Sequence, residues 1–273
     1  MTEPWTQWVT NMVGLDFEST GVDVFSDRIV TGSLVTIGGP KPVVHEWLVN
    51  PGVPIPEGAT AVHGITDAMA ADGCAPAEAL TAITGALRNA MTFGGAAGPG
   101  VHPVPIVAFN GAYDLSLMHA ECVRHGVKPL DRVVGVIDPY IIDKHVDRFR
   151  PGKRQLAVMC ATYRVRIDGA HESTADVLAT LRIVWRMAQL AQAKPETLRE
   201  YYADRKHPGE LVEAWRALGA LTLDELHAAQ IGWAAEQAAS FRSYLVDRGE
   251  YERAAAVDGA WPIRPFRATS GVG

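Results

Sequence analysis

The sequence predicts an α/β fold in which helices pack on a mixed sheet of five strands. In the first half of the chain, runs rich in β-branched residues follow one another closely, which is typical of antiparallel pairing. In the second half, short apolar strands alternate with helical patterns, which favours parallel strands covered by helices. The 273 residues, 48% of them hydrophobic with a mean hydropathy of +0.02, suffice for such a core plus an appendage.

The first three strands form one meander in this prediction. The short apolar run that begins at Val13 is the first strand, and residues 28–37 and 43–49 are the next two. Residues 38–42, rich in glycine and proline, separate the second strand from the third, so the two should pair antiparallel. Further proline and glycine in residues 50–58 end the meander.

Helices and two more strands follow. A helical pattern covers Pro76 to Met91, and the glycine-rich stretch from Thr92 to Pro105 predicts a flexible surface loop, since it lacks the Gly-Lys-Ser/Thr ending of a phosphate cradle. Residues 106–109 and 133–137 are short strands of the buried type.

The remaining pattern is helical. A helix should start in the turn from Asn110 to Asp114 and stop at Gly126, and helical periodicity continues from about residue 138 to Leu190. Breaks are expected at residues 151–152 and 168–169, where proline or glycine occurs.

Composition narrows the class of protein. Cys74, Cys122 and Cys160 are odd in number and widely spaced, which argues against a disulfide framework and favours reduced thiols in a cytoplasmic protein. The start of the chain has no signal-peptide pattern, and the longest apolar helical run is broken by Arg182 and Arg186, so no membrane association is expected.

Charge is unevenly distributed along the chain. A net charge of −6 argues against a protein that coats nucleic acid. The segment from Lys144 to Arg166, however, contains seven basic residues and a single acid, Asp147, so this basic segment has a net charge of +6. The pattern fits a solvated helix face and a phosphate-binding flank equally well.

Asp16 and Glu18 close the first strand. Because side chains alternate across a strand, both carboxylates project to the same side. Two carboxylates this close repel each other unless a cation lies between them. Their oxygen atoms are the ligand type that Mg²⁺ and Mn²⁺ prefer. Alone, an Asp-x-Glu pair also fits a solvated strand end.

Two further acids occupy positions from which they can reach the end of a strand. Asp114 follows the strand at residues 106–109 at the start of a helix, and Asp176 lies in the first turn of another helix. A helix N-terminus also helps to keep a carboxylate ionised. His171 precedes Asp176 by five residues.

These residues fall into three ordered motifs: Asp16-Phe17-Glu18-Ser19-Thr20-Gly21, Phe109-Asn110-Gly111-Ala112-Tyr113-Asp114, and the stretch from His171 to Asp176. Together with His63-Gly64-Ile65-Thr66, they resemble the motifs of the DnaQ-like 3′–5′ exonucleases of the DEDDh type, which include the proofreading epsilon subunit of DNA polymerase III. Asp138-Pro139 and Gln155-Leu156 fall where later elements of that family occur. Ser19 stands where the family usually has threonine, and a hydroxyl is kept.

The resemblance covers residues 12–192 and implies an RNase H-like sheet. It places an exonuclease domain at residues 1–193 and leaves residues 194–273 as a helical C-terminal extension. In this extension, Thr222 to Glu225 has the form of a capping box ahead of a long helix. The extension is expected either to pack on the exonuclease domain or to form an arm that docks a partner.

The resemblance also implies a metal-dependent mechanism. Asp16, Glu18, Asp114 and Asp176 would hold two Mg²⁺ or Mn²⁺ ions at the scissile phosphate, and His171 would be the general base. One ion would activate a water and the other would stabilise the departing 3′ oxygen.

Substrate contacts are implied as well. Phe17 and Thr20 would contact the terminal nucleotide, while His63 and Asn110 would line its pocket. For Phe17 a plain core position is the alternative, and for Asn110 a helix cap.

The implied function is 3′–5′ hydrolysis of single-stranded DNA in proofreading or repair, with a DNA polymerase as a candidate partner. An RNA exonuclease is the alternative from the same chemistry, because pocket shape senses the 2′-OH. A non-catalytic binding module that kept the fold is a third, which the complete set of four acids and His171 disfavours.

Overall fold

The computed structural model describes residues 5–93, 104–166 and 173–265. The expected break at residues 168–169 lies outside the described residues, as does most of the expected surface loop. The helix before that loop continues to Phe93, two residues beyond its predicted end.

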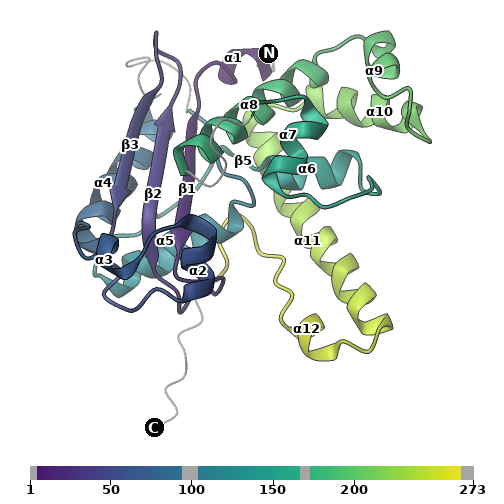
Figure 1. Ribbon diagram of the computed structural model, residues 1–273. Helices are drawn as coiled ribbons and strands as arrows, with labels where there is room; N and C mark the ends of the chain where they lie inside the picture. Colours follow the sequence, from purple (N-terminus) through teal and green to yellow (C-terminus); the bar gives the residue numbers. More distant parts are fainter. Residues whose placement is uncertain (1–4, 94–103, 167–172, 266–273) are drawn as a thin grey trace.

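Five strands form one sheet (Figure 1). They are β1 (Val13–Ser19), β2 (Ile29–Thr36), β3 (Val43–Leu48), β4 (Ile106–Val107) and β5 (Val136–Ile137). Across the sheet the order is β3-β2-β1-β4-β5; β1, β2 and β3 pair antiparallel, whereas β4 and β5 run parallel to β1. The mixed five-stranded sheet is therefore confirmed.

The last two strands are shorter than predicted. Gly135 has a φ of +64°, so extended pairing can begin only at Val136. Asn110 has a φ of +56°, and the chain turns there toward the next helix. Apolar composition marked these strands correctly, but it could not locate the backbone turns that limit them.

Helices cover both faces of the sheet (Figure 1). The helices are α1 (Trp5–Trp8), α2 (Glu57–His63), α3 (Asp67–Ala70), α4 (Pro76–Phe93), α5 (Ala112–Arg124), α6 (Pro139–Val146), α7 (Leu156–Tyr163), α8 (Ser173–Ala191), α9 (Pro195–Tyr201), α10 (Pro208–Gly219), α11 (Leu223–Asp247) and α12 (Tyr251–Ala255). Among the described residues, no helix is both long and apolar enough to span a membrane.

The alternation of side chains along β1 divides the core in two. Val13, Leu15 and Phe17 pack with α4 and α5 on one face. Gly14 lies on the other face, under α8, where a Cβ atom would come within 2.4 Å of Val177 Cγ1. The absence of a side chain at Gly14 therefore lets α8 lie directly on β1.

Helices of the C-terminal third share the core of α8. Leu198, Trp215 and Leu226 are buried in the same hydrophobic cluster as Met187. The capping box at Thr222 is confirmed, because its hydroxyl accepts from the Glu225 N–H while the Glu225 carboxylate accepts from the Thr222 N–H. These contacts favour packing over a free arm, and the division at residue 193 stays a prediction.

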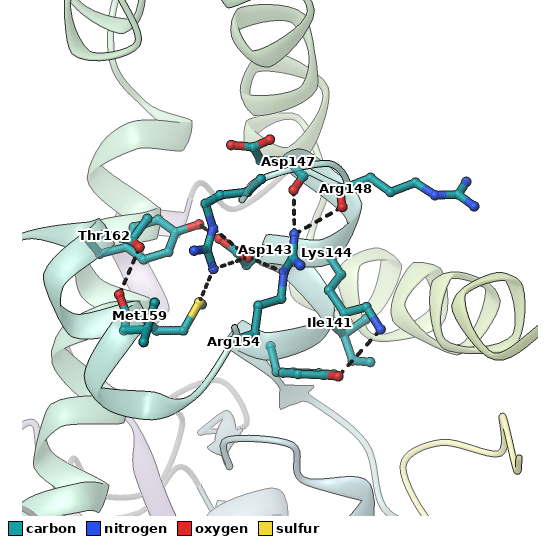
Figure 2. A network of polar contacts seen from close by, with 12 residues as sticks. Ile141, Asp143, Lys144, Asp147, Arg148, Arg154, Met159 and Thr162 are labelled. Atoms are coloured by element: carbon teal, nitrogen blue, oxygen red, sulfur yellow. Dashed lines mark hydrogen bonds and ion pairs between the residues drawn. The ribbon is translucent and has the colours of Figure 1, made fainter. Parts of the chain in front are cut away.

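A buried ion-pair network joins α6 to α7 (Figure 2). Asp143 accepts hydrogen bonds from Arg150 Nη2 at 2.9 Å, Arg154 Nε at 2.6 Å and the Tyr163 hydroxyl at 2.9 Å. Arg154 also donates to the Asp147 carbonyl. A buried carboxylate held by several donors compensates for its own desolvation. Two cations of the basic segment are thus used inside the protein.

Helix α11 closes the β5 edge of the sheet. The buried Gln230 side chain accepts from the Asp138 N–H at 2.8 Å and donates to the Val136 carbonyl at 2.9 Å. His227 Nδ1 accepts from the Val136 N–H at 3.2 Å. The two side chains thereby supply the hydrogen bonds that a further strand would make.

Asp138, just after β5, connects three segments. Its buried carboxylate accepts from the backbone N–H groups of Asn110, Gly111 and Tyr140 at 2.9–3.0 Å. The Trp261 indole donates to it at 3.3 Å. Burial raises the pKa of Asp138 to about 6, while these donors act in the opposite direction.

We expect Gln230→Leu to destabilise the fold by about 2–4 kcal/mol, because two buried backbone groups, the Val136 carbonyl and the Asp138 N–H, lose their partners. Urea unfolding followed by circular dichroism measures the change. Gln155→Ala is the matched control, since this exposed glutamine makes no side-chain cap bond, and its effect should stay within about 0.5 kcal/mol. Equal stability of both variants would contradict the edge-closing role.

Asp138→Asn should remove a pH dependence of stability. The pKa of Asp138 is about 6 in the fold, against about 3.9 in an unfolded chain. Between these values the folded state keeps a proton that the unfolded chain releases, so the free energy of unfolding falls as pH rises. The wild-type value minus the variant value should therefore decrease by about 2.3 kcal/mol from pH 4 to pH 7.

Urea titrations at several pH values measure this difference. Asp131→Asn removes an equal charge at an exposed side chain and is the control. A difference that instead increases with pH would mean that the N–H donors around Asp138 outweigh its burial.

Candidate functional site

An electrostatic cluster of carboxylates lies at the C-terminal end of β1. The pKa of Asp16 is raised well above its ordinary value, first by burial and then by the negative charges of Asp114, Glu18 and Asp176. The other three acids that the sequence analysis singled out therefore lie close enough to Asp16 to act on its charge. They come from β1, α5 and α8.

Asp114 is fixed to the strand that carries Asp16. It lies in the first turn of α5, and its Oδ1 accepts from the Phe17 N–H at 3.1 Å. Burial raises the pKa of Asp114, and this hydrogen bond lowers it in part. This hydrogen bond joins residues 97 positions apart in the sequence. It holds the carboxylate of Asp114 close to the strand that carries Asp16.

Asp176 is positioned by the docking of α8. Ser33 of β2, which pairs with Asp16, donates its hydroxyl to Ser173 at 3.0 Å. Thr174 contacts both Ser33 and the Glu46 carboxylate. With α8 pressed against Gly14, these bonds place the first turn of the helix over the acidic face of β1.

The donor chemistry of the cluster fits a divalent cation. All four side chains offer carboxylate oxygen, the ligand type that Mg²⁺ and Mn²⁺ prefer, and their mutual repulsion is what a bound cation would relieve. Among the described residues, no three His, Cys, Asp or Glu side chains are already arranged as a metal site. The carboxylates would thus have to converge further to hold an ion.

His171 lies outside the described residues, between α7 and α8. Its proposed role as general base therefore depends on the sequence motif alone. The described chain resumes at Ser173, three residues before Asp176.

Phe17 and Thr20 are both buried. Phe17 is 5% exposed, and its ring packs against Gly32 in the core below α4. Thr20 is also 5% exposed, and its hydroxyl donates to Asp27 Oδ1 while accepting from the Arg28 N–H. The core position weighed for Phe17 is the one observed, and Thr20 has a structural bond in a turn.

His63 and Asn110 lie at two separate turns of the fold. The pKa of His63 is lowered by burial and raised by an interaction with the backbone of Ser19, at the end of β1. Asn110 is exposed at the turn before α5, whose N-cap is Gly111 and has no side-chain cap bond. Their place in a substrate pocket stays a prediction from the motifs.

Sequence reasoning gave no role to Tyr113. Its hydroxyl contacts both Ser19 Oγ and the Gly21 carbonyl, which fixes the end of β1 beside the cluster. Burial raises the pKa of Tyr113 to about 12, so it is a hydrogen-bonding group and no proton acceptor at neutral pH. The only sequence signal was its place next to Asp114.

The comparisons with known proteins agree with this geometry. Residues 13–97 match the model of the exonuclease family named RNase_T. A DNA polymerase III subunit epsilon-like protein of Rhodobacter capsulatus is 47% identical over 70 residues, which are 24% of this chain and 10% of that protein. The chain therefore spans only a small part of this relative's length.

Two solved structures share the fold. E. coli exonuclease I in complex with a dT13 oligonucleotide has a TM-score of 0.51 at 18% identity, over 75% of this chain and 46% of that one. A 3′-exonuclease that recognises the 3′ end of the histone mRNA stem-loop has a TM-score of 0.55 at 16% identity, over 66% and 82%. In the sequence of residues 13–97 and in its fold, the chain is thus confirmed to resemble the DnaQ-like exonucleases.

Proposed function

We propose that the protein is a metal-dependent 3′–5′ exonuclease that removes nucleotides from single-stranded DNA. One observation carries this proposal: the carboxylates of Glu18, Asp114 and Asp176, from three separate elements, all act on the buried carboxylate of Asp16 at the end of β1. A fold gains no stability from such repulsion, so the arrangement favours a role in holding cations.

Each acid has a part in this proposal. Asp16, Glu18, Asp114 and Asp176 would hold two Mg²⁺ or Mn²⁺ ions, which when bound would polarise the scissile phosphate and offset the charge of the departing 3′ oxygen. The Phe17 N–H keeps Asp114 oriented toward β1. His171 takes a proton from the attacking water, since imidazole titrates near neutral pH.

His63 and Asn110 would line the pocket of the terminal nucleotide. Phe17 and Thr20 support this site through its frame: Phe17 by its backbone N–H to Asp114, and Thr20 through the turn after β1. The protein named as epsilon-like motivates a replication or repair setting with a DNA polymerase as partner.

RNA is the second candidate substrate. The 3′-exonuclease of similar fold that recognises a histone mRNA stem-loop motivates it. Digestion of 5′-labelled DNA and RNA single strands of the same sequence, with and without Mg²⁺, distinguishes the two candidate substrates. We expect DNA to be shortened from its 3′ end. If only RNA were digested, RNA would be the substrate in place of DNA.

Asp16→Asn should lower activity at least about 100-fold without unfolding the protein, because one cation ligand is lost. The thermal midpoint should stay equal or rise, since one member of a repelling cluster becomes neutral. Gel assays of the labelled DNA and thermal melts measure both. Asp72→Asn, at an exposed acid, is the matched control. Full wild-type activity in excess chelator would refute the metal requirement.

His171→Ala should lower kcat about 10²–10⁴-fold and leave KM within a few-fold, because only proton transfer is removed. The wild-type rate should also fall on the acid side, near pH 6.5 or above, as the imidazole protonates. Steady-state rates from pH 5 to pH 9 measure both effects, with His207→Ala as the control at an exposed histidine. A raised KM with unchanged kcat would assign His171 to binding.

A further inference from the structure

An arginine-rich cleft lies beside the outer face of α8, away from the sheet. It has a volume of about 500 Å³ and lies between the end of α7 and α8. Its lining consists of Arg164, Val165, Arg166, Arg182, Trp185, Arg186 and Gln189. Among the described residues, no acidic side chain lines this arginine cleft, although the whole chain has a net charge of −6.

Aromatic and polar contacts order the arginines. Tyr201, the last residue of α9, contacts two of the arginines. The guanidinium of Arg164 lies 4.7 Å from the centre of its ring, and that of Arg186 lies 5.5 Å from it. Arg182 donates to the Arg166 carbonyl at 3.1 Å, which ties α8 to the segment after α7. Four like charges held together by their surroundings form a site for an anion with several negative groups.

Trp185 points to the chemistry of the ligand. This large aromatic side chain is 48% exposed in the middle of the arginines. An exposed aromatic ring among cations provides a stacking surface for a base beside groups that bind phosphates. A free phosphate or an acidic peptide would use the arginines but would leave the indole without a matching partner.

The cleft is on the same helix as one of the catalytic acids. Arg182 follows Asp176 by six residues, which is about 9 Å along the helix axis. At about 3.6 residues per turn, Arg182 also lies about 120° around the helix from Asp176, so a nucleic-acid strand whose 3′ end lies at the carboxylates would pass around α8 to reach the arginines.

We propose that the arginine cleft binds the sugar-phosphate backbone of single-stranded nucleic acid, with one base stacked on Trp185. The inference deepens the proposed exonuclease function and rests on it for the direction of the strand. Of the basic segment, it uses Arg164 and Arg166, whereas Arg150 and Arg154 are held by Asp143.

Binding measured without hydrolysis tests the proposal. Fluorescence anisotropy with labelled 12-nucleotide DNA and RNA of one sequence, in EDTA and at several salt concentrations, gives Kd for the full chain. Trp185→Ala should raise Kd about tenfold. The double variant Arg166→Ala/Arg182→Ala should also raise Kd about tenfold and lower the slope of log Kd against log salt by about 1.4, two phosphate contacts at about 0.7 each.

Control variants remove equivalent groups elsewhere. Arg216→Ala removes an exposed arginine of α10, and Tyr251→Ala removes a 67% exposed aromatic of α12. Both should leave Kd unchanged, and thermal melts of all variants establish that they are folded.

Each outcome has one meaning. Wild-type Kd and salt slope in the cleft variants would overturn the proposal, as would polyglutamate binding the cleft as tightly as the oligonucleotides. A preference for the DNA or the RNA arm identifies the strand that the cleft takes. Cleft-dependent binding in a protein that digests neither strand would support the cleft and refute the exonuclease. Digestion of a strand by the protein, with unchanged binding in the cleft variants, would support the exonuclease and refute the cleft.

Discussion

The fold depends on one buried carboxylate, that of Asp138. Its oxygens accept hydrogen bonds from the turn between β4 and α5, from the start of α6 and from the indole of Trp261 near the end of the chain. The turn at Asn110 and Gly111 sets where α5 begins, and α5 carries Asp114. The position of a proposed catalytic acid thus depends on a carboxylate outside the cluster of four.

Opposite requirements meet at the end of β1. Stability would favour neutral side chains at this place, where Glu18, Asp114 and Asp176 raise the pKa of Asp16 and Glu18 raises that of Asp114. The surrounding contacts are correspondingly specific: a backbone N–H to Asp114, serine hydroxyls at the start of α8 and a glycine beneath it. Packing around the cluster carries the cost of keeping the charges together.

Local patterns predicted much of this from sequence. Alternation placed Asp16 and Glu18 on one face of a strand, and the positions of Asp114 and Asp176 in first turns of helices followed from helix periodicity. The capping box at Thr222 is equally local. Each of these features depends on residues within one turn or one strand, where sequence spacing and geometry correspond directly.

Contacts between distant segments could not be predicted in this way. Arg150 and Arg154 belong to a run of charge typical of a solvated surface, but a preceding helix supplies Asp143 and buries them. Gln230 is an ordinary helix residue in sequence, and only the tertiary fold brings it to β5, more than 90 residues earlier. Phe17 lies in a motif, yet its own strand turns the ring into the core.

The closure of β5 by α11 makes the two edges of the sheet unequal. At the other edge, β3 is exposed along most of its length, and Val43 and Val44 are 47% and 42% exposed. An edge strand with free main-chain groups can pair with a strand from another chain. Of the two edges of the described sheet, only the β3 edge is therefore left open to strand addition, and the exposed charges of Lys41 and Glu46 oppose it.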